Sequence, residues 1–232
     1  MTSNHFQSQG GGICLWACLL LFGSGLTAAV QAGEFATIKP ASTDKGYLAR
    51  LLINEVPFPG EHGYQSADDT KAAMLSILWV LHSRINYVPA GYTQQQIASS
   101  TSKNIIDVIT AKNQCEGFFL DAAGKPASAP RVEERLNYLR NIANSGGKPG
   151  RFASLLNFGQ GLASAYLENG ISGADRFAGL ETVNRIKVTG RAYSWMTDRD
   201  IYNPGGNFVT IPDAQNGTLG GNRFFTLRKD PK

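Results

Sequence analysis

The sequence predicts a mostly α-helical domain of the α+β class, with an irregular rim at its C-terminal end. Its 232 residues are 42% hydrophobic and 17% charged, which is enough apolar material for one real core. Several segments repeat apolar residues with the 3.6-residue period of a helix. After residue 190 the chain becomes rich in glycine, asparagine and aromatic residues, so only a short β-hairpin is expected there.

Residues 1–32 are expected to be a signal peptide that directs export to the periplasm or the extracellular space. An uncharged apolar run, Ile13–Val30, ends in small residues that a signal peptidase could read, Val30–Ala32. The alternative is an uncleaved anchor, because a run of about 20 apolar residues can span a bilayer. Gly23 and Gly25 favour cleavage, so a membrane is expected as a partner only if the leader is retained.

Residues 33–42 are expected to be a linker and residues 43–232 a single domain. Cys14 and Cys18 belong to the leader, so Cys115 is the one cysteine of the expected mature sequence and an internal disulfide is excluded. The leader carries no charge, and the mature part therefore holds the whole excess of 22 basic over 18 acidic residues, 22 − 18 = +4. This charge suits an anionic partner of the cell envelope, whereas no basic-aromatic run indicates nucleic acid.

Two predicted helices form the centre of this domain. The first carries leucines along one face, and Thr43 or Asp44 can cap its start. Before the second helix, Ser66 and Asp69 resemble a capping box. Residues 72–81 of the second helix are apolar on nearly every face, which predicts a buried central helix.

Shorter elements are expected around this centre. Three further segments have the character of helices: 104–114, 131–143 and 151–170. In the last of them, Gly159 and Ala163 would let another helix approach closely, and Asn169-Gly170 is expected to end it. Two stretches are expected to be loops: 87–104 and 121–130.

Glu55 continues the apolar face of the first helix, where a hydrophobic residue would be expected. Leu48, Leu51 and Leu52 precede it on the same face, and Pro57 then stops the helix. Desolvation and the negative end of the helix dipole should both raise the pKa of this carboxyl group. An acid that stays protonated near neutral pH could protonate the leaving oxygen of a glycosidic bond. The alternative is a structural role, in which Glu55 pairs with an arginine or caps a backbone group.

Four short motifs follow one another along the chain: Leu48–Glu55, Ser83-Arg84, Ile105–Gln114 and Gly221–Phe224. Their order and spacing resemble the SleB-type bacterial cell-wall hydrolases, the spore-cortex lytic enzyme family. The resemblance spans roughly Tyr47 to Leu227 and implies a lysozyme-like fold. It also implies cleavage of peptidoglycan glycan strands by a muramidase or lytic transglycosylase, with Glu55 as the general acid and base. No cofactor is expected.

The chain departs from the family's pattern at several positions. The compact Glu-Ala-Arg-Gly-Glu turn of the family is replaced by a longer one, so Glu61 becomes the candidate for the second acid. Cys115 stands where the family usually has phenylalanine, and Arg223 stands where it has a late histidine. Two segments are insertions relative to the family: 87–103 and 121–148.

A sugar site combines amide hydrogen bonding with aromatic faces, which gives a set of candidate groove residues. They are Gln114, Tyr166, Trp195, Tyr202, Asn222 and Phe224. For each aromatic residue the alternative is packing in the core. Glu116 is a further acidic candidate, whereas Asp68 and Asp69 are expected to serve the helix cap.

Two other functions remain open. A cysteine peptidase or peptidoglycan amidase would use Cys115 with His62 or His82, because a thiolate needs a nearby base. A non-catalytic envelope protein would keep the helices and the aromatic groove for glycan or partner binding, and it would tolerate Glu55→Gln. No His, Cys or acidic group has the spacing of a zinc site, so no metal is expected.

Overall fold

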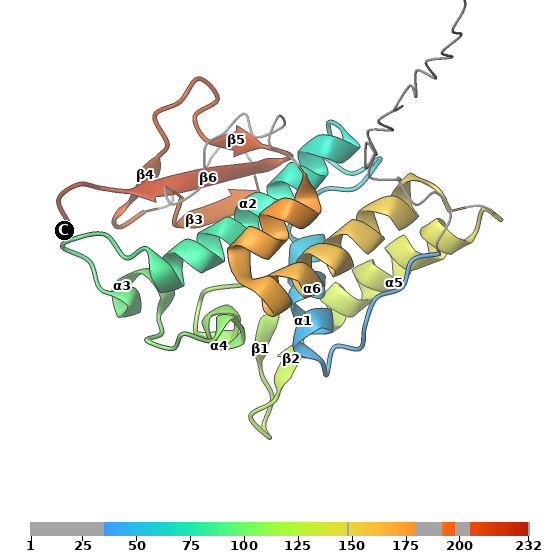
Figure 1. The fold of residues 1–232 in the computed structure, drawn as a ribbon, viewed down its shortest axis with the longest axis horizontal. Helices are drawn as coiled ribbons and strands as arrows, with labels where there is room; N and C mark the ends of the chain where they lie inside the picture. The colour runs from blue at the N-terminus through green and yellow to red at the C-terminus, as the bar shows by residue number, and fades with distance from the viewer. Residues whose placement is uncertain (1–34, 148, 180–191, 198–204, 232) are drawn as a thin grey trace, which may run out of the picture. The chain divides into compact units, whose positions relative to one another are not determined.

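Helices make up about half of the described chain, and a small antiparallel sheet accompanies them (Figure 1). A computed structural model describes residues 35–147, 149–179, 192–197 and 205–231, so the predicted signal peptide lies outside the described residues. The helices are α1 (Asp44–Asn54), α2 (Ala67–Asn86), α3 (Gln94–Ala98), α4 (Ile105–Thr110), α5 (Pro130–Asn144) and α6 (Arg151–Ala178). The strands are β1 (Phe118–Leu120), β2 (Pro126–Ser128), β3 (Ser194–Thr197), β4 (Phe208–Thr210), β5 (Thr218–Leu219) and β6 (Asn222–Leu227). This arrangement confirms the predicted α+β class.

Helix α1 lies at the centre of the helical part, where it contacts α2, α5 and α6 (Figure 1). Every residue from Gly46 to Ile53 is buried, including the three leucines of the predicted face. Thr43 caps the N-terminus, because its hydroxyl accepts a hydrogen bond of 3.1 Å from the Gly46 N–H. The apolar helix that ends in Glu55 is therefore enclosed on several sides.

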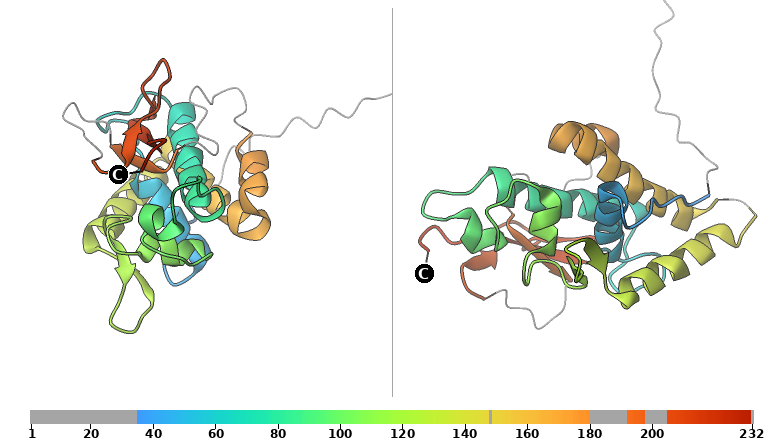
Figure 2. Two further views of the ribbon diagram at one scale, coloured as in Figure 1. Left: turned by 90° about the vertical axis from the view of Figure 1, so that its left-hand side faces the viewer. Right: turned by 90° about the horizontal axis from the view of Figure 1, so that it is seen from below.

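Helix α2 lies between α6 on one side and the sheet on the other (Figure 2). Its buried residues include most of the segment 72–81, as its uninterrupted apolar sequence predicted. Ser66 is the N-cap, and its hydroxyl accepts a 3.0 Å hydrogen bond from the Asp69 N–H and donates one of 2.6 Å to the Asp69 carboxylate. Asp69 thus serves the cap, as expected. No helix in the described ranges has the length and apolarity needed to cross a membrane.

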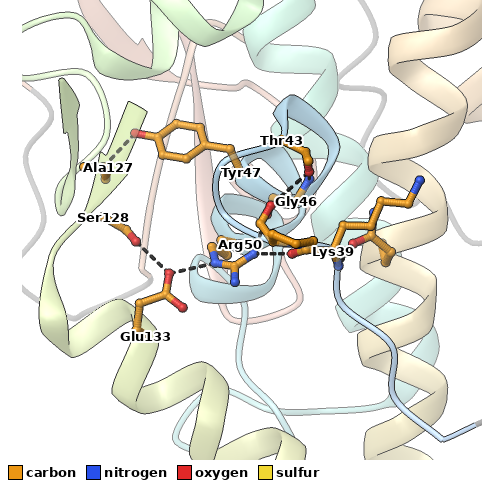
Figure 3. Close-up of polar contacts among 10 residues, drawn as sticks. Lys39, Thr43, Gly46, Tyr47, Arg50, Ala127, Ser128 and Glu133 are labelled. Carbon is orange, nitrogen blue, oxygen red and sulfur yellow. Dashed lines mark hydrogen bonds and ion pairs between the residues drawn. The ribbon is translucent and has the colours of Figure 1, made fainter. Parts of the chain in front are cut away.

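Arg50 joins the middle of α1 to α5 (Figure 3). Its guanidinium donates to the Glu133 carboxylate at 2.7 Å and to the carbonyl oxygens of Lys39 at 2.7 Å and Gly46 at 3.0 Å. Glu133 also accepts a 2.7 Å hydrogen bond from the Ser128 hydroxyl, just before α5. These contacts satisfy a cation that is only 8% exposed, and they fix α5 against α1.

Residues 35–42, the described part of the expected linker, contain no helix or strand but lie against α5 and α6. The backbone N–H of Ala36 donates to the Asn144 side chain at 3.3 Å. The N–H of Lys39 donates to the Gln160 side chain at 2.8 Å. The segment is therefore bound to the helical domain over its described length.

Helix α6 changes direction at Gly170, the residue where the sequence predicted its end. Gly170 has non-helical dihedral angles, φ 64° and ψ −162°. A second helical segment then continues to Ala178 and folds back, so that the Phe177 and Phe158 rings lie 5.5 Å apart. The predicted break is correct, but the returning segment was missed because it is short and contains a glycine.

Three parts of the chain contain more regular structure than the sequence predicts. The C-terminal part is a sheet in which β6 pairs antiparallel with β3, β4 and β5, rather than a short hairpin alone. Strand β2 lies within the expected loop 121–130 and forms a hairpin with β1, which directly precedes that loop, and α3 lies within the expected loop 87–104. The sheet around β6 depends on distant partners, which a local pattern does not report, whereas β1, β2 and α3 are too short to give a clear period.

Gly159 allows α6 to lie close to α1. A Cβ atom at this position would lie 2.9 Å from Cγ1 of Ile53 and 3.4 Å from Sδ of Met74. We therefore expect Gly159→Val to lower the free energy of unfolding by about 1–3 kcal/mol, as overpacking does, measured by chemical denaturation. Ser154→Val, on the exposed face of the same helix, is the matched control and should be close to wild type. An unchanged stability in Gly159→Val would contradict the close approach.

Candidate functional site

Glu55 directly follows α1 and lies between two adjoining cavities, which we call the Glu55 groove. The cavities have volumes of about 410 and 150 Å³, and both are lined by Glu55 and Thr197. The larger one is also lined by Asn113, Gln114, Cys115, Glu116, Trp195 and Met196. The smaller one is also lined by Asn54, Val56, Pro57, Glu61, His62, Arg135 and Gly221. Glu55 is thus the acid at which the two parts of the groove meet.

Side chains from two strands hold Glu55 in this position. The indole N–H of Trp195, on β3, donates to the Glu55 carboxylate at 3.0 Å. The side-chain amide of Asn222, on β6, donates to the Glu55 backbone carbonyl at 2.8 Å. Asn54 makes a longer contact with the carboxylate, at 3.5 Å. Among the described residues, the carboxylate is therefore held by neutral donors and forms no ion pair.

Burial raises the pKa of Glu55 above its ordinary value of 4.5, as the sequence predicted. Desolvation is the main cause, and the negative charge of Glu116 acts in the same direction. The hydrogen bonds from Trp195 and Asn54 and the positive charge of Arg135 lower the pKa and so oppose this rise. Because the net shift is upward, the protonated acid persists to higher pH than for an exposed glutamate, which suits a proton donor.

Arg84, from the predicted Ser83-Arg84 motif, connects Trp195 to Gln114. Its guanidinium lies 5.2 Å from the centre of the Trp195 ring, a cation–π contact. It donates to the Gln114 side chain at 2.9 Å and to the Tyr193 carbonyl at 2.7 Å. Burial lowers the pKa of Arg84 to about 10, which still leaves it cationic at neutral pH. Arg84 therefore fixes two of the predicted groove residues from inside the protein.

The other predicted groove residues lie elsewhere. Asn222 is fully buried behind Glu55 and does not line the groove, and Phe224 is 0% exposed and belongs to the core. Tyr166 lies away from the groove on α6, where its hydroxyl is 3.2 Å from Nδ1 of His82. Tyr202 lies outside the described residues. Phe224 therefore packs in the core, which was the alternative for each aromatic candidate.

Glu61 lines the smaller cavity, but its carboxylate is engaged by Arg135. The distances are 3.1 Å from the arginine Nε and 2.5 Å from its Nη2. The backbone N–H of Phe58 also donates to Glu61, at 2.8 Å. No local pattern pointed to Arg135, because it lies on a helix whose periodicity indicated only an amphipathic surface element.

Cys115 and the two described histidines do not form a nucleophile and base pair. Cys115 lines the larger cavity, and burial raises the pKa of its thiol to about 12, which disfavours the reactive thiolate at neutral pH. His62 lines the smaller cavity, and His82 packs against Tyr166 outside the groove. Within the described ranges, no three His, Cys, Asp or Glu side chains gather as metal ligands do.

The groove combines a partly buried acid, Glu55, with an indole donor, amide side chains and a further carboxylate, Glu116, at its edge. Glu116 pairs with Arg131 at 2.7 Å, and both side chains are largely exposed. This set can donate a proton to an oxygen of a polar, extended ligand and can hydrogen-bond its hydroxyl and amide groups. No protein-family model, curated protein or solved structure matches the chain.

The raised pKa of Glu55 has a consequence for stability. The folded protein holds this proton to higher pH than the unfolded chain, so the contribution to stability falls as pH rises from about 4.5 through the folded pKa. Glu55→Gln removes the charge but keeps an acceptor for Trp195. We expect it to be more stable than wild type at about pH 8 and nearly equal to it at about pH 4, because only the ionised acid is costly.

Differential scanning calorimetry at the two pH values measures this difference. In a domain of this size, each 1 kcal/mol corresponds to about 2–4 °C in Tm. The contrasting variant is Glu61→Gln, which should lose stability because it breaks the ion pair with Arg135. A Tm of Glu55→Gln at or below that of wild type at the higher pH would contradict an ionisation cost at Glu55.

Proposed function

We propose that the protein cleaves the glycan strands of peptidoglycan, as a muramidase or lytic transglycosylase with Glu55 as general acid and base. The observation that carries the proposal is the partly buried Glu55 carboxyl group, with a raised pKa, at the junction of the two cavities. Glycosidases need such an acid to protonate the leaving oxygen. The resemblance to the SleB-type cell-wall hydrolases supports the same reaction.

The proposal includes a lysozyme-like fold and export from the cytoplasm. The lysozyme-like fold is supported by a glutamate at the end of a buried helix, beside a small antiparallel sheet. Export is supported by the uncharged apolar leader and by the net charge of +4. This charge suits peptidoglycan and the anionic polymers of the envelope, which lie outside the cytoplasm. The catalytic domain then meets its substrate where the leader would deliver it.

The reaction begins with protonated Glu55. Its proton passes to the glycosidic oxygen between two amino sugars, the bond from the anomeric carbon to that oxygen breaks, and the leaving sugar departs with a hydroxyl group. The resulting carboxylate is stabilised by the Trp195 indole N–H at 3.0 Å. A water molecule or a hydroxyl group of the substrate itself then attacks the anomeric carbon. The Glu55 carboxylate accepts the proton of this attacking group, which restores protonated Glu55.

The engagement of Glu61 favours the transglycosylase variant of this reaction. Its carboxylate accepts hydrogen bonds from Arg135 and from the Phe58 N–H, so it acts as an anchor for the chain after α1. Glu116, the other acid of the groove, is paired with Arg131. An attack by the substrate's own hydroxyl group requires no second catalytic carboxylate, unlike the usual hydrolytic mechanisms.

Digestion of purified sacculi tests this proposal. The protein should release soluble fragments, and mass spectrometry should find anhydro ends if it is a transglycosylase or reducing ends if it is a hydrolase. Glu55→Gln should lower the rate by about 100-fold or more, as loss of a general acid does, with an unchanged helical circular dichroism signal. Cys115→Ala is the control for the cysteine mechanism and should retain activity. Cleavage by Glu55→Gln at the wild-type rate would remove Glu55 from the reaction.

Trp195→Phe should change the pH dependence of the rate. Loss of the indole N–H removes an interaction that lowers the pKa of Glu55, so this pKa rises further. Because the reaction needs protonated Glu55, the alkaline limb of the kcat/KM profile should move to higher pH. Tyr166→Phe, on α6 outside the groove, is the matched control and should leave the profile unchanged. A shift to lower pH in Trp195→Phe would contradict the assigned role of the indole.

A further inference from the structure

Arg135 projects from α5 to the end of α1 and lines the smaller cavity beside Glu55. We propose that Arg135 is a positioning residue for Glu55, because it holds the backbone on both sides of this residue. The catalytic part of this inference rests on the proposed function. The structural part does not, because it concerns the geometry of the end of α1.

The two backbone contacts of Arg135 flank Glu55 in the chain. Nη1 donates to the Ile53 carbonyl and Nη2 to the Val56 carbonyl, both at 2.9 Å. Carbonyl groups at the end of a helix have no donor within the helix, so a side chain from elsewhere must satisfy them when they are buried. Arg135 satisfies the Ile53 carbonyl of the last helical turn in this way and also binds the Val56 carbonyl just beyond the helix, so it fixes the direction in which the chain leaves α1.

Glu61 and Phe58 complete the unit around Arg135. The Glu61 carboxylate binds the guanidinium through Nε and Nη2, and the Phe58 ring lies 5.6 Å from its central carbon. Since Glu61 also accepts the Phe58 N–H, the turn between Val56 and Glu61 closes on the arginine. This unit gives the longer turn a fixed shape where the resembling family has a compact one.

Charge alone does not account for this arrangement. The planar guanidinium donates from three nitrogens to three acceptor groups, a pattern that a lysine ammonium group cannot reproduce. The positive charge has a second effect, because it lowers the pKa of Glu55 and so limits the rise caused by burial. Arg135→Lys separates the effect of the positive charge from that of the hydrogen-bond geometry. It keeps the charge but loses the planar set of N–H donors.

Arg131 provides the matched control. It lies four residues earlier on α5 and pairs with the exposed Glu116 carboxylate at 2.7 Å. Arg131→Lys makes the same chemical change on the same helix, and it also keeps the charge next to Glu116. We expect this variant to resemble wild type in every measurement below.

The first measurement is independent of catalysis. In the ¹H–¹⁵N spectrum of the full chain, the indole N–H of Trp195 reports its hydrogen bond to Glu55, and Trp195→Phe assigns that signal. Arg135→Lys should shift the signal, because Glu55 no longer keeps its place opposite the indole. Arg131→Lys should leave it at the wild-type position. An unshifted indole signal in Arg135→Lys would overturn the positioning role, whether or not the protein cleaves peptidoglycan.

The second measurement is kinetic. Arg135→Lys should lower kcat by about tenfold to a hundredfold, as misplacement of a catalytic group does, with a much smaller change in KM. Its alkaline limb should move to higher pH only as far as the weakened indole hydrogen bond raises the pKa of Glu55, because the positive charge remains. Arg135→Gln should also move the alkaline limb to higher pH, since a cation that lowers the pKa of Glu55 is lost.

A wild-type kcat in Arg135→Lys would overturn the inference. So would an equal fall of kcat in Arg135→Lys and in Arg131→Lys. If Arg135→Gln does not fold, the lysine variant alone decides through the indole signal and kcat. A wild-type protein that leaves sacculi intact would refute the proposed function, and the indole signal would still decide the role of Arg135.

Discussion

The carbonyl groups at the end of α1 accept hydrogen bonds from side chains on opposite sides of the domain. Arg135 of α5 binds the carbonyls of Ile53 and Val56, and Asn222 of β6 binds that of Glu55. A buried helix end needs such partners, because unpaired carbonyl groups in the interior are costly. Hydrogen bonds from the helical part and from the sheet therefore converge on the backbone around Glu55, the residue that carries the carboxyl group of the groove.

This construction makes the ionised form of Glu55 costly to the fold and suits the protonated form to the proposed proton transfer. Burial disfavours its charged form, whereas the Trp195 indole and the charge of Arg135 limit the cost. A core leucine at the same position would pack without any such cost. A partly buried acid beside an open groove is the kind of local conflict that functional sites carry and that the surrounding structure offsets.

Helix α5 illustrates how a surface element can decide the geometry of a site. Its apolar residues follow a simple amphipathic pattern, and this pattern indicates only that one face packs on the domain. Glu133 and Arg135 lie on the same helix, and they bind Arg50 near the middle of α1 and the backbone at its end. An ion pair from Glu133 and a hydrogen bond from the Arg135 guanidinium to the Ile53 carbonyl thus hold α1 near its middle and at its end (Figure 3 shows the ion pair).

The sequence by itself determined the elements whose signals are local. The caps at Thr43 and Ser66, the apolar faces of α1 and α2, the break at Gly170 and the exceptional place of Glu55 can all be read from neighbouring residues. Of the candidate groove residues, Trp195 and Gln114 line the larger cavity and Phe224 lies in the core, a difference that the sequence does not reveal because an aromatic residue suits a core and a sugar site equally. The pairing of β6 with three strands, and the contact between Arg135 and Glu61, were decided only by the tertiary structure. The physical reason is that hydrogen bonds between distant segments depend on where the chain returns in space, and the residues around each partner do not encode that position.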